Sequence, residues 1–153
     1  MKITQVKVLI TAPDRRNFVL VKVSTDAGLY GWGEGTLNGN EPVVARAIEH
    51  MTPLLLGVDP QRIEDVWQFV HTWPYFRGGP VYMAALGAID LALWDIKGRQ
   101  ARLPAYQLLG GRSRRGAMVY GHAGGRDAAE AAEDVRRFLA RGYKVVRVQQ
   151  GPY

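Results

Sequence analysis

Alternation of apolar and polar residues marks the beginning of the chain. Within residues 17–25, valine occupies every second position from 19 to 23, and this period places the valines on one face of a β-strand. Residues 2–10 show a similar strand-like pattern, and residues 29–34 follow the turn-forming residues 26–28. These segments predict an antiparallel meander of three strands.

Glycine occupies every second position from Gly31 to Gly35, within and after the third predicted strand. A phosphate-binding loop has a similar glycine spacing, but it must lead directly into a helix. Here residues 36–40 intervene, and glycines inside a strand more often mark a close approach of another backbone. We therefore interpret these glycines as packing positions and discount nucleotide binding.

A helical period, with apolar residues three or four positions apart, follows the sheet. It predicts one helix that begins at the cap residue Asn40 and ends before Pro53. A second helix is predicted to begin at Asp59, with proline at its first helical position, and to end at His71. The start of the chain is thus predicted to be an antiparallel sheet covered by helices.

The longest predicted helix, residues 81–102, is apolar on nearly all sides, which predicts burial between layers. On it, Asp95 is expected to pair with Arg99 one turn later, in a structural role. The aromatic and glycine-rich residues 72–80 precede this helix, and the pattern leaves open whether they form a packed connector or a lid over a polar ligand. Gly110 and Gly111 are expected to end the helical region.

The last part of the chain has the order strand, helix, strand. Residues 117–122 and 144–150 show strand-like patterns, and the helix between them has the capping residues Asp127 and Glu130 and ends at Gly142. This order is typical of a parallel β-sheet. The helix is predicted to bury Ala131, Val135, Phe138 and Leu139.

Two polar residues stand out in this βαβ unit. His122 falls at the C-terminal end of the first predicted strand, where parallel α/β folds bind their ligands. Arg147 interrupts the second strand, although strands of parallel sheets are usually apolar on both faces. The pattern leaves open whether each residue is a structural, solvated side chain or part of a site.

Composition narrows the class of protein. A hydrophobic content of 47% and an aromatic content of 10% are typical of a packed globular chain. The absence of cysteine excludes disulfides, cysteine-based zinc sites and a thiol nucleophile. With no signal region and no apolar run of membrane-spanning length, we expect a soluble cytoplasmic protein without a membrane partner.

The formal net charge of +6 and the pI near 9.8 raise the question whether the chain binds nucleic acid. The basic residues are spread along the chain and, on the predicted helix after Asp127, are interleaved with acidic ones, which is typical of a solvated face. We expect no nucleic-acid partner, and a basic nucleic-acid-binding module remains an alternative hypothesis. The chain also has no Ser-His-Asp pattern, Walker loop, HExxH motif or acidic pair for a metal.

Beyond these patterns, the sequence resembles the mandelate racemase and muconate lactonising branch of the enolase superfamily, in residues 92–98 (ALWDIKG) and 104–111 (PAYQLLGG). Within that branch it resembles the D-mannonate dehydratase family, in residues 36–39 (TLNG), 62–65 (RIED), 119–123 (VYGHA) and 147–149 (RVQ).

The resemblance implies an α+β capping domain over residues 1–112, followed at residues 113–153 by the first βαβ unit of an incomplete (β/α)-barrel of the TIM type. It implies that Asn38 and His122 bind a sugar acid and that Arg147 stands at the catalytic base. In the family, a tyrosine after the second barrel strand works with this arginine to remove the proton next to the carboxylate, and the 3-hydroxyl then leaves. A fixed cation lowers the pKa of a phenol and makes it a usable base.

The resemblance also implies Mg²⁺, which stabilises the enediolate and whose ligands are expected on later barrel strands, beyond residue 153. No metal ligand is therefore assigned within this chain, and Tyr153 is too close to Arg147 to be assigned as the base. We expect the chain to be the N-terminal part of a homo-oligomeric hydro-lyase that converts D-mannonate to 2-keto-3-deoxy-D-gluconate. Residues 1–153 alone are expected to be inactive. Another acid sugar such as D-gluconate as substrate, or a non-catalytic interaction protein derived from the family, are the alternatives.

Overall fold

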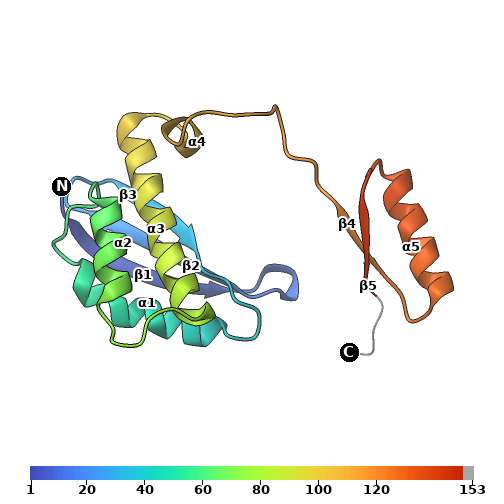
Figure 1. Ribbon diagram of the computed structural model, residues 1–153, viewed down its shortest axis with the longest axis horizontal. Helices are drawn as coiled ribbons and strands as arrows, with labels where there is room; N and C mark the ends of the chain where they lie inside the picture. The colour runs from blue at the N-terminus through green and yellow to red at the C-terminus, as the bar shows by residue number, and fades with distance from the viewer. Residues whose placement is uncertain (150–153) are drawn as a thin grey trace. The chain divides into compact units, whose positions relative to one another are not determined.

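The computed structural model describes residues 1–149 and divides the chain into two compact units, Met1–Gly111 and Arg112–Tyr153 (Figure 1). Gln150, the predicted end of the last strand, and Tyr153 lie outside the described residues. The first unit contains the antiparallel sheet with helices, and the second contains a parallel strand pair with one helix. The assignment of these parts as a capping domain, residues 1–112, and the start of a barrel, residues 113–153, stays a prediction.

The sheet of the first unit is the predicted antiparallel meander. Strands β1 (Ile3–Thr11), β2 (Phe18–Thr25) and β3 (Tyr30–Glu34) lie in the order β1-β2-β3. The three alternating valines of β2 are fully buried on one face, as the period of two requires. A short 3-10 turn, Pro13–Arg15, joins the first two strands.

Helices α1 (Glu41–Leu55) and α3 (Pro80–Ala101) pack against this face of the sheet, and α2 (Ile63–Thr72) packs against both helices (Figure 1). The short helix α4 (Ala105–Leu108) follows α3. One apolar core fills the space between the layers; its largest fully buried side chains include Ile3, Ile48, Met51, Leu55, Leu86, Ile89, Leu93 and Ile96.

Two predicted helix boundaries were wrong. Helix α1 continues through Pro53 because Ile48, Met51 and Leu55 are all fully buried, so packing of the last turn outweighs the one backbone hydrogen bond that proline cannot make. Helix α2 begins three residues after the predicted proline. The Asp59 carboxylate accepts the Gln61 N–H at 3.0 Å, which closes a turn before the helix instead of capping it.

The glycines of β3 lie against helix α3 at backbone distance. A Cβ atom at Gly33 would lie 1.8 Å from the carbonyl oxygen of Ala88, and one at Gly31 would lie 2.0 Å from that of Ala92. No side chain fits at such distances, because the obstacle is the backbone of a rigid helix. The packing interpretation of these glycines is confirmed.

Asp95 has the structural role that the sequence indicates. Its carboxylate accepts a hydrogen bond from the Arg99 side chain at 3.0 Å, one turn along α3. The same carboxylate oxygen also accepts the backbone N–H of Trp32 in β3 at 2.9 Å. Asp95 therefore connects the helix to the edge of the sheet, a contact between residues that are far apart in sequence.

Asp90, half-buried on α3, makes the stability of the first unit depend on pH. Burial raises the pKa of its carboxyl, and the negative charge of Glu64 raises the pKa further. Because the folded-state pKa lies above the unfolded value of about 3.9, the protein loses stability as pH rises from that value through the raised pKa. We expect Asp90→Asn to increase the free energy of unfolding at pH 7 and to have little effect near pH 3, measured by urea unfolding.

Glu64→Gln supplies the matched comparison, because it removes only the second cause of this shift. It should give a smaller gain at pH 7 than Asp90→Asn. Loss of stability at pH 7 in the Asp90→Asn variant would contradict the prediction.

The second unit consists of β4 (Gly121–Gly124), α5 (Ala128–Ala140) and β5 (Val146–Gln149), with β4 and β5 parallel. The order strand, helix, strand is therefore confirmed. The predicted extent of the first strand, residues 117–122, was wrong. Pairing begins only where Gly121 donates its N–H to the carbonyl of Val145, because no other described strand pairs with residues 117–120.

Helix α5 starts as its capping residues predict. The Asp127 carboxylate accepts the Glu130 N–H at 2.9 Å, and the Glu130 carboxylate accepts the Arg126 N–H at 3.0 Å. Of the predicted core residues of this helix, Ala131 is buried, whereas Leu139 is 52% exposed. The expectation for Leu139 was wrong because β4 and β5 cover only one side of the helix.

None of the helices described between residues 1 and 149 is both long and apolar enough to cross a membrane.

Candidate functional site

The structure brings two of the predicted site residues together. His122 of β4 and Arg147 of β5 are register partners across the parallel strands. Residues paired in this way point to the same face of a sheet, and both side chains are exposed there. His122 is the second residue of β4, so the expectation that it ends the strand was wrong.

Helix α5 covers the opposite face of the strand pair at β4. Ala123 is 3% exposed, and a Cβ atom at Gly121 would lie 2.4 Å from the ring of Phe138. The alternation of the strand then leaves His122 on the face that α5 does not cover. The packing of α5 together with the alternation of the strand thus fixes which side of β4 carries the polar residue.

The chemistry of this open face is that of a cation beside an imidazole. The guanidinium of Arg147 offers a fork of donors that fits a carboxylate. The imidazole of His122 exchanges hydrogen bonds with hydroxyl groups through its two nitrogens. Together the two side chains can bind a small organic acid that carries hydroxyl groups.

Tyr120 is a neighbour of this pair that we did not assign to the site from the sequence. Its ring stacks on the imidazole of His122, with 4.9 Å between the centroids and 26° between the planes. The signal was present in the spacing, because residues two positions apart share one face of an extended chain.

Asn38, the third predicted site residue, belongs to the first unit and is exposed. It lies in a turn between β3 and α1, in which Asn40 donates its N–H to the carbonyl of Leu37 at 2.8 Å. Gly39 takes a positive φ of 80° in this turn, a conformation that glycine adopts without strain. The turn therefore holds the Asn38 amide in solvent at the end of β3.

The aromatic loop between α2 and α3 is also exposed. Tyr75 is 92% exposed and Phe76 is 88% exposed, and their rings meet edge to face at 5.2 Å. The ring of Trp73, at the start of this loop, lies beside the His50 ring of α1, with 5.1 Å between the ring centroids. The start of the loop thus contacts α1, and the aromatic side chains at its tip are exposed.

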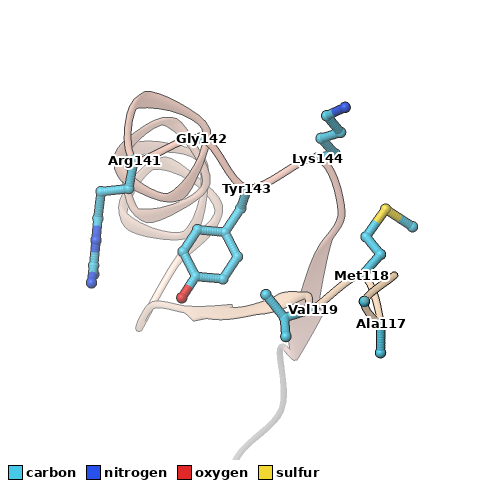
Figure 2. Close-up of a pocket in the computed structure, with 8 residues that line it drawn as sticks. Ala117, Met118, Val119, Arg141, Gly142, Tyr143 and Lys144 are labelled. Carbon is cyan, nitrogen blue, oxygen red and sulfur yellow. The ribbon is translucent and has the colours of Figure 1, made fainter. Parts of the chain in front are cut away.

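A pocket of about 530 Å³ opens elsewhere in the second unit (Figure 2). It is lined by residues 116–119 and 141–144, with Tyr143 and Val119 contributed by different segments of the chain. These segments precede β4 and β5, so the pocket lies at the N-terminal ends of the strands. Parallel folds bind their ligands at the opposite ends. The pocket also offers cations but no acid or imidazole, and we regard the face with His122 and Arg147 as the stronger candidate.

The resemblance implies Mg²⁺, whose usual protein ligands are carboxylate oxygens. Among residues 1–149, no group of three or more His, Asp or Glu side chains could hold a metal ion. The residues present therefore do not fit a metal centre of their own.

The sequence matches known protein families over nearly its full length. A family model described as mandelate racemase / muconate lactonizing enzyme, N-terminal domain, matches residues 1–110. A D-mannonate dehydratase of Novosphingobium aromaticivorans is 57% identical over 152 residues, which are 99% of this chain and 38% of that protein. A D-galactonate dehydratase family member of Oceanicola granulosus is 53% identical, over 99% of this chain and 37% of its own length. The chain thus spans less than two fifths of these relatives.

Solved structures agree with this result. The crystal structure of an enolase from Pantoea ananatis, with bound D-gluconate and Mg, has a TM-score of 0.90 and 45% identity, over 97% of this chain and 36% of that one. A putative dehydratase from Salmonella enterica also has a TM-score of 0.90, with 34% identity, over 97% of this chain and 42% of that one. The predicted fold class, a three-stranded antiparallel sheet with helices followed by a parallel unit, is confirmed.

Proposed function

Because this chain belongs to the mandelate racemase / muconate lactonizing enzyme family, we propose that it is the N-terminal part of a Mg²⁺-dependent sugar-acid dehydratase. The proposed reaction is that of a hydro-lyase, with D-mannonate as the preferred substrate and 2-keto-3-deoxy-D-gluconate as the product. One observation carries the proposal. A histidine and an arginine are register partners on one open face of parallel strands, in a chain 57% identical to a D-mannonate dehydratase.

In this proposal, each of the three site residues has a role that its chemistry supports. Asn38 and His122 bind hydroxyl groups of the sugar acid, because an amide and an imidazole both donate and accept hydrogen bonds. Arg147 stands at the catalytic base, where its permanent charge lowers the pKa of a neighbouring phenol and favours removal of the proton next to the carboxylate.

The metal belongs to other parts of the proposed enzyme. Bound Mg²⁺ would stabilise the negative charge that develops on the carboxylate side of the substrate. We assign no ligand and no step of the reaction to a metal held by residues 1–149, which offer no suitable cluster. The proposed ligands lie beyond residue 153, and the complete protein is proposed to be a cytoplasmic homo-oligomer without a nucleic-acid partner.

A panel of sugar acids tests the substrate. D-Mannonate, D-gluconate and D-galactonate are incubated with the complete protein and Mg²⁺, and the 2-keto product is measured. We expect the highest kcat/KM for D-mannonate, and no turnover by residues 1–153 alone. A clear preference for D-gluconate would favour the second candidate substrate, which the similar Pantoea ananatis structure contains. Dehydration of none of the three acids would favour a non-catalytic interaction protein.

A further inference from the structure

The stack between Tyr120 and His122 lies at the start of β4, with Tyr120 immediately before the strand. Gly121 and Ala123 face α5, and the ring of Phe138 lies where a Cβ of Gly121 would be. Tyr143 holds that phenylalanine ring edge to face, with 5.1 Å between centroids and 86° between planes. Because this packing fixes the rotation of the strand, the side chains before and after Gly121 both project from the other face.

The stacked tyrosine limits how the imidazole can turn. A histidine alone on an open strand face occupies several rotamers, and a ligand must select one of them on binding. The ring of Tyr120 lies nearly parallel to the imidazole, with 26° between the planes, and so favours one orientation of that ring. The favoured orientation holds the His122 nitrogens in a defined direction on the face shared with Arg147.

We propose that Tyr120 is a positioning residue for His122 in sugar-acid binding. This inference rests on the function proposed above. Tyr120 acts through the imidazole and not on the reacting atoms, and its ring rather than its hydroxyl carries the effect. A phenylalanine at this position should therefore keep the function, whereas an aliphatic side chain of similar size should lose it.

The stack itself is tested by NMR on residues 1–153. The imidazole protons of His122 are compared in the wild type and in the Tyr120→Phe, Tyr120→Leu and Met118→Leu variants. Met118 is the matched control, because it is an exposed apolar residue two positions earlier and carries no ring. We expect Tyr120→Leu to remove the upfield ring-current shift of the His122 protons and the other two variants to keep it. Unchanged shifts in Tyr120→Leu would overturn the proposal.

The positioning role is tested by kinetics on the complete protein. We expect Tyr120→Leu to raise KM for D-mannonate roughly 2- to 10-fold, the factor typical of one aromatic pair, with kcat nearly unchanged. Tyr120→Phe should restore the wild-type KM, and Met118→Leu should not change it. A Tyr120→Leu enzyme with the KM of the Met118→Leu control would overturn the positioning role.

The two tests separate the possible failures. A wild-type protein that dehydrates no sugar acid would refute the proposed function and with it the role of Tyr120, even if NMR finds the stack. An active wild type whose KM does not respond to Tyr120→Leu would refute the role of Tyr120 alone.

Discussion

Replacing Gly33 by alanine is expected to lower the free energy of unfolding of the first unit by about 3 kcal/mol or more, at the upper end of the usual cost of overpacking. The added Cβ would lie 1.8 Å from the carbonyl oxygen of Ala88. The obstacle is the backbone of α3 and not the end of a flexible side chain. Either β3 or α3 must move, and both contribute to the same core. Urea unfolding followed by tryptophan fluorescence measures the loss.

Gly87→Ala is the matched control, because it makes the same chemical change on α3 itself. A Cβ at Gly87 would meet nothing within 4 Å. This variant is expected to gain up to about 1 kcal/mol, because alanine favours the helix more than glycine does. Equal stabilities of the two variants would contradict the packing of β3 on α3 that the structure shows.

Arg147→Met is expected to lower kcat for D-mannonate by a factor of about 10² to 10³ in the complete protein, the usual effect of removing one group that stabilises developing charge. Methionine keeps much of the length of the side chain and removes the charge. Since Arg147 is exposed, the substitution should change the free energy of unfolding by about 0.5 kcal/mol or less. Arg147→Lys should recover only part of the activity, because an ammonium group lacks the planar fork of donors.

Lys144→Met provides a control that also distinguishes the two candidate sites, the pocket and the face with His122. Lys144 lines the pocket in Figure 2, before β5, and Arg147 lies on the face opposite α5. We expect Lys144→Met to retain wild-type kcat/KM. An active Arg147→Met enzyme, or an inactive Lys144→Met enzyme, would contradict the assignment of the site to the His122 face and favour the pocket.

Local periods predicted most of the elements. Alternation placed the three strands of the sheet within one residue of their observed ends, and the capping residues placed the start of α5. Two boundaries failed where contacts distant in sequence decide them. Helix α1 passes Pro53 because its last turn is buried, and β4 starts at Gly121 because its partner strand β5 begins only at Val146. A short window of sequence contains neither fact.

The residues of the candidate site were likewise predicted only in part. Alternation alone is enough to place Tyr120 and His122 on one face, and it marked Arg147 as unusual for a parallel strand. Asn38 carried no such signal, because an asparagine in a turn is ordinary, and only the resemblance to a family suggested it. The stack of Tyr120 on His122 was not predicted, since spacing defines a shared face but not the approach of two rings.

The sequence by itself determined the order of elements, the glycine packing positions of β3 and the positions of His122 and Arg147 within predicted strands, because each follows from the period of the neighbouring residues. Only the tertiary structure decided the register that makes these two residues partners. It also decided that α5 covers the opposite face. The register depends on hydrogen bonds between strands more than twenty residues apart in the chain, and the covered face depends on side-chain packing of α5 against β4, so no short window of sequence contains that information.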